Sequence, residues 1–265
     1  MSHRRHFTSA LFVRIRALHW LGAVFVLGAV PFSRGAENDL PAITAAALQR
    51  PGVEITALEF LPAGSFAPPE GGATLEELPA FCRIAATLRT TPESHIRIEV
   101  WLPRENWNGR LLGTGNGGSA GRILYNYLAM GVKRGFATVN TDLGTSPNVE
   151  GLAHSPERWR DFGYRATHEM TVVARQWATA FYGRSPQRAY FVGGSTGGQQ
   201  ALMAAQRFPE DYDGILAHKP ANNRTLLHHN HLWNWRALNE TPDSRLTAEQ
   251  IAWVNRAVVA ANVGK

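Results

Sequence analysis

The chain has 265 residues, of which 44% are apolar and 10% aromatic, enough for one sizeable buried core and too apolar for a disordered or low-complexity chain. Its formal net charge is +6, but residues 1–36 hold five arginines and no acid, so the rest of the chain carries only +1. A nearly neutral body does not support nucleic-acid binding.

The first 36 residues are predicted to be a secretory signal peptide. An arginine-rich start leads into the apolar run ALHWLGAVFVLGAV and then into small residues around Ser33 and Gly35, which is the order of an export signal. The apolar run is too short to span a bilayer comfortably, although an uncleaved membrane anchor remains an alternative. We therefore expect an exported protein, periplasmic or secreted, with no stable membrane insertion after cleavage near Ala36, and residues 37–265 as the folded part.

From residue 80 onward the sequence predicts strands that alternate with helices. The runs FCRIAATLR and HIRIEVWLP flank the turn cluster TTPES and predict an antiparallel hairpin. Further strands are predicted in GRLLGTGNGG, FATVNTD, RAYFVGG and YDGILAH, and helices in NYLAMGVKRG, THEMTVVARQWATAFYG and TGGQQALMAAQRF. Such alternation is typical of an α/β fold with a mostly parallel sheet flanked by helices.

Ser195 is the candidate nucleophile. It is the serine of a G-x-S-x-G pattern between a predicted strand and a predicted helix, which is the context that gives this pattern its meaning. Gly193, Gly194 and Gly197 would form the sharp turn, and the amide of Thr196 at the helix N-terminus could donate to a developing oxyanion. A purely structural tight turn is the alternative.

A second oxyanion donor is expected from the glycine-rich loop GTGNGGSAG, residues 113–121, which follows a predicted strand. Gly117 or Gly118 is the candidate donor. The loop also matches G-x-G-x-x-G, the dinucleotide fingerprint, but a clean short βα unit does not follow it. The oxyanion interpretation is preferred, and a structural turn stays open.

Several long motifs occur in order and resemble the tannase and feruloyl esterase family. They are LPAFCRI, IEVWLPRENWNGRLLGTGNGG, RGFATVNTD, DFGYRATHEMTVVARQ and GGSTGGQQALMAAQRFPEDYDGILA. The resemblance implies an exported α/β-hydrolase that cleaves esters of aromatic acids, with Ser195 as nucleophile and an oxyanion hole formed by Thr196 and the loop of Gly117 and Gly118. It also implies an inserted lid domain, usually calcium-binding.

Two features depart from that family pattern. The family usually has a cysteine before the serine, bonded to a second cysteine beside the catalytic histidine, but here Gly194 precedes Ser195 and Cys82 is the one cysteine in the sequence. Cys82 is expected to be inert. The seventy residues after Ser195 offer one further strand, so we expect an α/β-hydrolase-type domain incomplete at its C-terminus, truncated before the lid, the catalytic Asp and the catalytic His.

Histidines after the serine could substitute for the missing base. His218 ends the strand after the nucleophile helix, and His228, His229 and His231 cluster in LLHHNHLWNW. A zinc or copper site and a replacement base are two alternatives for these histidines. A solvated or lid-contacting loop is preferred, so no metal site is predicted. His154 precedes the serine. His168 is expected to be a surface or capping residue, and Asp142 and Asp161 to cap helices or bond loops rather than to act in catalysis.

The sequence therefore predicts a serine ester hydrolase that works through an acyl-enzyme on Ser195. Its partner would be a small aromatic ester. No cofactor is expected within this chain, because calcium would belong to the lid. A non-catalytic α/β-hydrolase-like module that binds an aromatic ligand or partner is the alternative, and a decayed gene product that does not fold stably is a third possibility.

Overall fold

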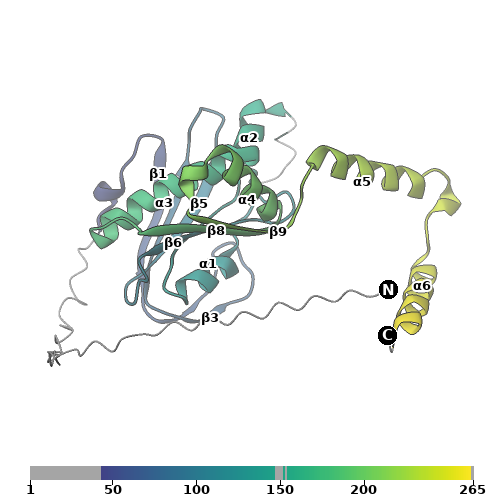
Figure 1. Ribbon diagram of the computed structural model, residues 1–265, viewed down its shortest axis with the longest axis horizontal. Helices are drawn as coiled ribbons and strands as arrows, with labels where there is room; N and C mark the ends of the chain where they lie inside the picture. The colour runs from purple at the N-terminus through teal and green to yellow at the C-terminus, as the bar shows by residue number, and fades with distance from the viewer. Residues whose placement is uncertain (1–42, 147–151, 153, 264–265) are drawn as a thin grey trace, which may run out of the picture. The chain divides into compact units, whose positions relative to one another are not determined.

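A computed structural model describes residues 43–146, 152 and 154–263; the predicted signal peptide lies outside the described residues. Most of the described strands form one seven-stranded sheet in the order β1-β4-β5-β7-β6-β8-β9 (Figure 1). The strands of this sheet are β1 (Val53–Leu61), β4 (Phe81–Leu88), β5 (Ile96–Pro103), β6 (Arg110–Thr114), β7 (Ala137–Thr141), β8 (Arg188–Ser195) and β9 (Gly214–Pro220).

The sheet has two halves that differ in strand direction. Strands β7, β6, β8 and β9 pair in parallel, and we call β6–β9 the parallel half. Strands β1, β4 and β5 pair antiparallel with one another, and β5 meets β7 antiparallel; these three form the antiparallel half. Because β4 runs in the same direction as β6–β9, the sheet is mostly parallel, and both the predicted α/β class and the predicted β4–β5 hairpin are confirmed.

Helices cover both faces of the sheet (Figure 1). On one face, α1 (Tyr125–Val132) packs with Trp101 and Phe81 in a small aromatic core. On the other face, α3 (Ala166–Tyr182) and α4 (Thr196–Arg207) bury residues in the main core. Helix α3 ends at Gly183 in the left-handed region (φ 66°), as the sequence predicts.

The sequence does not predict two parts of the fold, the edge strand β1 and a small separate sheet of two strands. Strand β1 lies at the sheet edge, and a register shift between Ile55 and Ala57 breaks the alternation that would have marked it as a strand. The other is a separate two-stranded sheet of β2 (Gly64–Phe66) and β3 (Leu75–Leu78). It places the ring of Phe66 edge-on to Trp101, with 5.1 Å between ring centroids.

The remaining helices lie before α3 and after β9. Helix α2 (Pro156–Arg160) continues through a π-helical turn, Asp161–Arg165, into α3. Helices α5 (Arg224–Leu238) and α6 (Ala248–Asn262) bury none of their residues. In the part of the chain that the structure describes, no helix is both long and apolar enough to cross a membrane.

The point where the strand order reverses creates the place for a site. Strand β6 leads through α1 to β7 on one side, whereas its other neighbour, β8, leads through α4 to β9. Because α1 and α4 cover opposite faces, the chain segments that leave β6 and β8 diverge at the carboxyl ends of these neighbouring strands. Ligands of open α/β sheets bind at such crevices.

Candidate active site

Ser195 lies in the sharp turn between a strand and a helix, where the sequence predicts it. It is the last residue of β8, and α4 begins at the next residue. Its backbone has φ 57° and ψ −117°, a region that non-glycine residues rarely adopt and that costs on the order of 1–3 kcal/mol. Its side chain is exposed. A strained, exposed serine at a strand–helix corner is suited to nucleophilic attack.

The glycines of the turn differ in how much space they have. A Cβ on Gly193 would lie 2.3 Å from the carbonyl oxygen of Gly197, and one on Gly197 would lie 3.0 Å from the Cα of Gly115. No side chain fits at Gly193. At Gly194 the nearest atom to such a Cβ would be the His218 carbonyl oxygen at 3.4 Å, an ordinary contact. The tight turn therefore requires glycine at 193, and Gly194 has room for a small side chain.

The structure brings the predicted oxyanion loop against this turn. The amide of Gly197 donates to the carbonyl oxygen of Asn116 at 2.7 Å, and the Thr196 hydroxyl donates to the carbonyl oxygen of Gly118 at 2.6 Å. Gly117 and Gly118 are exposed, and the space around both is open. The structure thus places the loop of Gly117 and Gly118 against Thr196, the residue that follows Ser195.

A base for Ser195 is not visible in the described part of the chain. Among residues 43–146, 152 and 154–263, none makes a hydrogen bond with the Ser195 hydroxyl. His218 lies on β9 opposite Gly194, and its Cδ2 atom would be 3.5 Å from a Gly194 Cβ. Its ring is exposed. His218 is therefore a neighbour of the turn rather than a partner of the serine.

The histidine cluster lies on α5 and not in a loop, so the predicted loop is wrong. His228, His229 and His231 are exposed, and the ring centroids of His228 and His231 are 6.1 Å apart. Within the described ranges, no three His, Cys, Asp or Glu side chains come together as metal ligands. His154 is also exposed.

The two acidic candidates, Asp142 and Asp161, have structural partners. Asp142 accepts from the backbone amides of Arg97 and Gly144 at 2.9 and 2.8 Å, which is loop bonding as expected. Asp161 is the N-cap of no helix, because it follows α2 directly and begins the π-helical turn. It accepts from Ser94 at 3.1 Å and from Arg165 at 2.5 Å. Both carboxylates are buried.

His168 is neither a free surface residue nor a cap. It lies in the first turn of α3, where its Nδ1 is 2.8 Å from the Asp211 carboxylate. This hydrogen bond raises the pKa of His168 above its ordinary value. Its ring stacks on Phe208 with 4.1 Å between centroids. The pair joins α3 to the end of α4.

Two side chains at the turn were missed from sequence. Arg224, the first residue of α5, donates to the Thr196 hydroxyl at 2.7 Å and to Gln199 at 2.8 Å. Gln200 of α4 accepts from the Asn116 amide at 2.8 Å. The two glutamines follow the glycines of a helix start, which is a weak signal for contact with the loop; nothing in the sequence marks Arg224.

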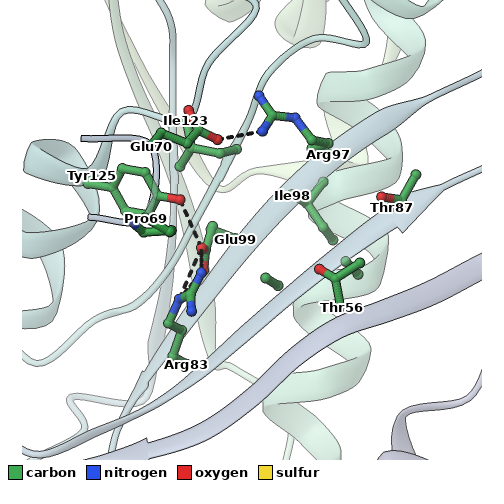
Figure 2. Close-up of a pocket in the computed structure, with 12 residues that line it drawn as sticks. Thr56, Pro69, Glu70, Arg83, Thr87, Arg97, Ile98, Glu99, Ile123 and Tyr125 are labelled. Atoms are coloured by element: carbon green, nitrogen blue, oxygen red, sulfur yellow. Dashed lines mark hydrogen bonds and ion pairs between the residues drawn. The ribbon is translucent and has the colours of Figure 1, made fainter. Parts of the chain in front are cut away.

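A pocket of about 230 Å³ lies elsewhere, in the antiparallel half (Figure 2). The charged side chains that line it are paired with one another: Arg83 bonds Glu99, and Arg97 bonds Glu70. The Tyr125 hydroxyl donates to Glu99. None of its lining residues belongs to the Ser195 turn or to residues 115–118. We interpret it as a gap beside a structural ion-pair network.

Cys82 lies on β4 and is fully buried. Burial raises the pKa of its thiol to about 12. A thiol that stays protonated is a poor nucleophile, and the expectation of an inert cysteine is consistent with this environment.

The chain is similar in sequence to a known protein family and to several of its members. Residues 82–263 match the family model described as "Tannase and feruloyl esterase". A protein of Xanthomonas campestris named as an uncharacterized esterase is 34% identical over 217 residues, which cover 81% of this chain and 38% of that protein. Feruloyl esterase B of Aspergillus niger is 39% identical over 165 residues, which cover 61% of this chain and 32% of the enzyme.

Solved structures of esterases superpose on this chain. The crystal structure of feruloyl esterase B from Aspergillus oryzae superposes with a TM-score of 0.63 and 36% identity, covering 66% of this chain and 36% of that one. Tannin acyl hydrolase from Aspergillus niger superposes with a TM-score of 0.58 at 24% identity, which supports the fold. The chain thus spans less than half the length of these relatives.

Proposed function

The chain belongs to the tannase and feruloyl esterase family, and on this basis we propose that it supplies the nucleophile and oxyanion hole of a carboxylic ester hydrolase that acts on esters of aromatic acids. The single observation that carries the proposal is Ser195, exposed at φ 57° on the β8–α4 corner with the loop of Gly117 and Gly118 against it. The proposed substrate class is supported by the family and by the feruloyl esterases that the chain resembles.

The reaction proceeds through an acyl-enzyme. The Ser195 oxygen attacks the ester carbonyl carbon while a general base takes the hydroxyl proton. The negative charge that develops on the carbonyl oxygen is met by the amides of Thr196 and of Gly117 or Gly118. The tetrahedral intermediate collapses, the alcohol leaves with the proton, and an acyl-serine remains. Water, activated by the same base, then attacks this ester, and the aromatic acid and free Ser195 are released.

The base and its supporting acid remain predictions. We propose that they are an Asp and a His outside these 265 residues. We also propose that the protein is exported to the periplasm or the medium. The proposal of an external base is supported by the environment of Ser195, since within the described residues no histidine bonds its hydroxyl. Hydrolysis should therefore be measured on the complete gene product and, in parallel, on the 265-residue chain.

The test uses methyl ferulate and methyl gallate as substrates. The complete product should hydrolyse at least one of them, and Ser195→Ala should lower kcat by about 10⁴-fold or more. Ser185→Ala, which removes an exposed hydroxyl in the loop before β8, is the matched control and should keep full activity. Activity that survives Ser195→Ala would contradict the proposal. Fast hydrolysis by the 265-residue chain alone would contradict only the external base.

A non-catalytic module that binds an aromatic ligand is the second candidate. The observation that favours it is the exposed aromatic surface of α5, where Trp233 and Trp235 are 65% and 62% exposed. Saturable binding of methyl gallate by the complete product, unchanged by Ser195→Ala and without release of gallate, would support this function in place of hydrolysis.

A further inference from the structure

The Thr196 hydroxyl joins three segments that are far apart in the sequence. It donates to the carbonyl oxygen of Gly118 at 2.6 Å and accepts from Nη2 of Arg224 at 2.7 Å. Thr196 is 2% exposed, so its hydroxyl is shielded from water. A hydroxyl has one proton to donate, and here Arg224 fixes that proton toward the oxyanion loop.

This contact matters because the two proposed oxyanion donors come from different elements. The Thr196 amide belongs to the start of α4, and the amide of Gly117 or Gly118 belongs to the loop after β6. Catalysis by such a pair depends on their separation, because a misplacement of about 1 Å can cost about 10²-fold in rate. The Thr196–Gly118 bond ties the residue that supplies one donor directly to the residues that supply the other.

Other bonds hold the loop on both sides of Gly118, and Thr196 bonds the carbonyl oxygen of Gly118 itself. After Gly118, the Thr145 hydroxyl donates to the Ser119 carbonyl oxygen at 2.8 Å. The Gly197 amide donates to the Asn116 carbonyl, and the Asn116 amide donates to Gln200. Gly117 and Gly118, one and two residues further on, are exposed and have open space around them. A glycine backbone has wide conformational freedom, so the Thr196 bond adds a restraint at Gly118 and links this point of the loop to the nucleophile turn.

Arg224 is placed to strengthen that bond. It donates to the neutral acceptors Thr196 and Gln199, and its guanidinium lies 5.2 Å from the ring centroid of Phe162. Within the described residues it forms no ion pair, and burial lowers its pKa. A cation that donates to a hydroxyl polarises it and strengthens the bond that the hydroxyl donates in turn.

We propose that Thr196, through its side chain, and Arg224, through Thr196, are positioning residues that fix the oxyanion loop at Gly118 against the nucleophile turn. This inference rests on the proposed ester hydrolase function. Neither side chain touches the reacting atoms in this role. Their effect is on the transition state, where the oxyanion needs both amides at once, and hardly at all on substrate binding.

The first test removes the hydroxyl at constant shape in the complete gene product, with methyl ferulate or methyl gallate as substrate. Thr196→Val should lower kcat about 10- to 100-fold and change KM by about twofold at most. Thr196→Ser keeps the hydroxyl and should keep kcat within about threefold of the parent. Thr179→Val is the matched control, because the Thr179 hydroxyl also donates to a backbone carbonyl, that of Arg175 at 2.7 Å, within α3.

The second test asks whether Arg224 acts through Thr196. Arg224→Gln should lower kcat by a smaller factor than Thr196→Val, and the double variant should lose no more than Thr196→Val alone, because both act on one bond. Arg134→Gln, which removes an exposed arginine bonded to the Met130 carbonyl, is the control. Independent, additive losses would overturn the link between Arg224 and Thr196.

The outcomes separate this inference from the proposed function. Activity that survives Ser195→Ala refutes the ester hydrolase mechanism itself. Loss of activity in Ser195→Ala with full kcat in Thr196→Val, or with a change in KM alone, refutes the positioning role and leaves the mechanism standing. Should Thr196→Val fail to fold, Arg224→Gln decides: unchanged kcat in that variant overturns the inference, and a reduced kcat at constant KM supports it.

Discussion

The two halves of the sheet hold their shape by different means. At the parallel half, backbone segments pack directly against each other. Gly197 lies close to Gly115 and to Gly193, and there is no room for a side chain at Gly193. In the antiparallel half, a charged network is buried instead, with Arg83 bonded to Glu99 at 2.5 Å and to Glu59 at 3.0 Å. Steric fit positions the proposed site, and paired charges organise the opposite end of the same sheet.

The difference follows from what each half has to do. A reacting centre needs fixed distances between backbone amides, and close contact between glycines sets such distances without flexible side chains. A buried ion pair tolerates small shifts, but it requires that every charge remain paired. Substitutions that add atoms should therefore destabilise the glycine contacts of the parallel half. Substitutions that remove one member of an ion pair should destabilise the antiparallel half.

The largest effect is expected from one added methyl group at Gly193. Its Cβ would overlap the backbone of Gly197 at 2.3–2.7 Å, and backbone cannot move aside without opening the turn. Gly193→Ala should lower the free energy of unfolding by about 3 kcal/mol or more, measured by urea denaturation of the purified protein.

The neighbouring glycine provides the matched control. Gly194 is not in the positive-φ region, and its added Cβ would lie at 3.4 Å from the His218 carbonyl oxygen. Gly194→Ala should change the free energy of unfolding by less than about 1 kcal/mol. Equal costs at the two positions would show that close backbone packing does not define the parallel half.

The next largest effect is expected from removal of one charge in the antiparallel half. The side chains of Arg83 and Glu99 are only 9% and 3% exposed, and Arg83→Met would leave Glu99 with Tyr125 and Trp101 as its donors. A buried carboxylate without its cation should cost about 3 kcal/mol. Arg89→Met is the control, because its pair with Glu54 is exposed and 4.0 Å long, and it should cost under about 1 kcal/mol.

The cost of Arg83→Met should also depend on pH. Burial raises the pKa of Glu99 above its ordinary value of 4.5 even with Arg83 present, and loss of the cation raises it further. A carboxyl with a raised folded-state pKa is tolerated in its protonated form, so its destabilising effect appears as the pH rises through that pKa. Arg83→Met should thus be less destabilised at pH 5 than at pH 8. A cost that is equal at both values, or larger at pH 5, would contradict a buried, charged Glu99.

The nucleophile turn could be predicted from sequence because its cause is local. Two glycines at fixed spacing around Ser195, between a strand and a helix, determine the corner, and the structure has β8 ending and α4 beginning there. The approach of Gly118 was expected as well, because loops after neighbouring parallel strands meet at one sheet edge. The hydrogen bond between the Gly118 carbonyl and the Thr196 side chain was not expected, since the sequence does not determine the rotamer of that side chain.

The missed features depend on contacts between distant residues. Arg224 reaches Thr196 across 28 positions, and no periodicity marks it. Strand β1 was missed because its bulge and its edge position break the alternation. The Arg83–Glu99 pair was detectable: Arg83 is the one charge in β4 and Glu99 the one acid in β5, and the two strands form a predicted hairpin. The cost of burying either charge alone favours their pairing.

The smallest effect is expected from a charged pair beside the parallel half, that of His168 on α3 and Asp211 after α4. Their side chains are 30% and 11% exposed, so Asp211→Asn should cost about 1 kcal/mol at most. Because the hydrogen bond to Asp211 raises the pKa of His168 above 6.5, its contribution is complete below that value and is lost as the pH rises through the raised pKa. Urea denaturation should show the cost at pH 6 and little of it at pH 8.5.

The matched variant Asp213→Asn breaks a pair with Arg188 at 2.6 Å. This pair does not titrate in this range, so the cost of the variant should be the same at both pH values. A pH-dependent loss in Asp211→Asn as large as that of Arg83→Met would show that charge, too, holds the parallel half together, and the contrast between the two halves would fail.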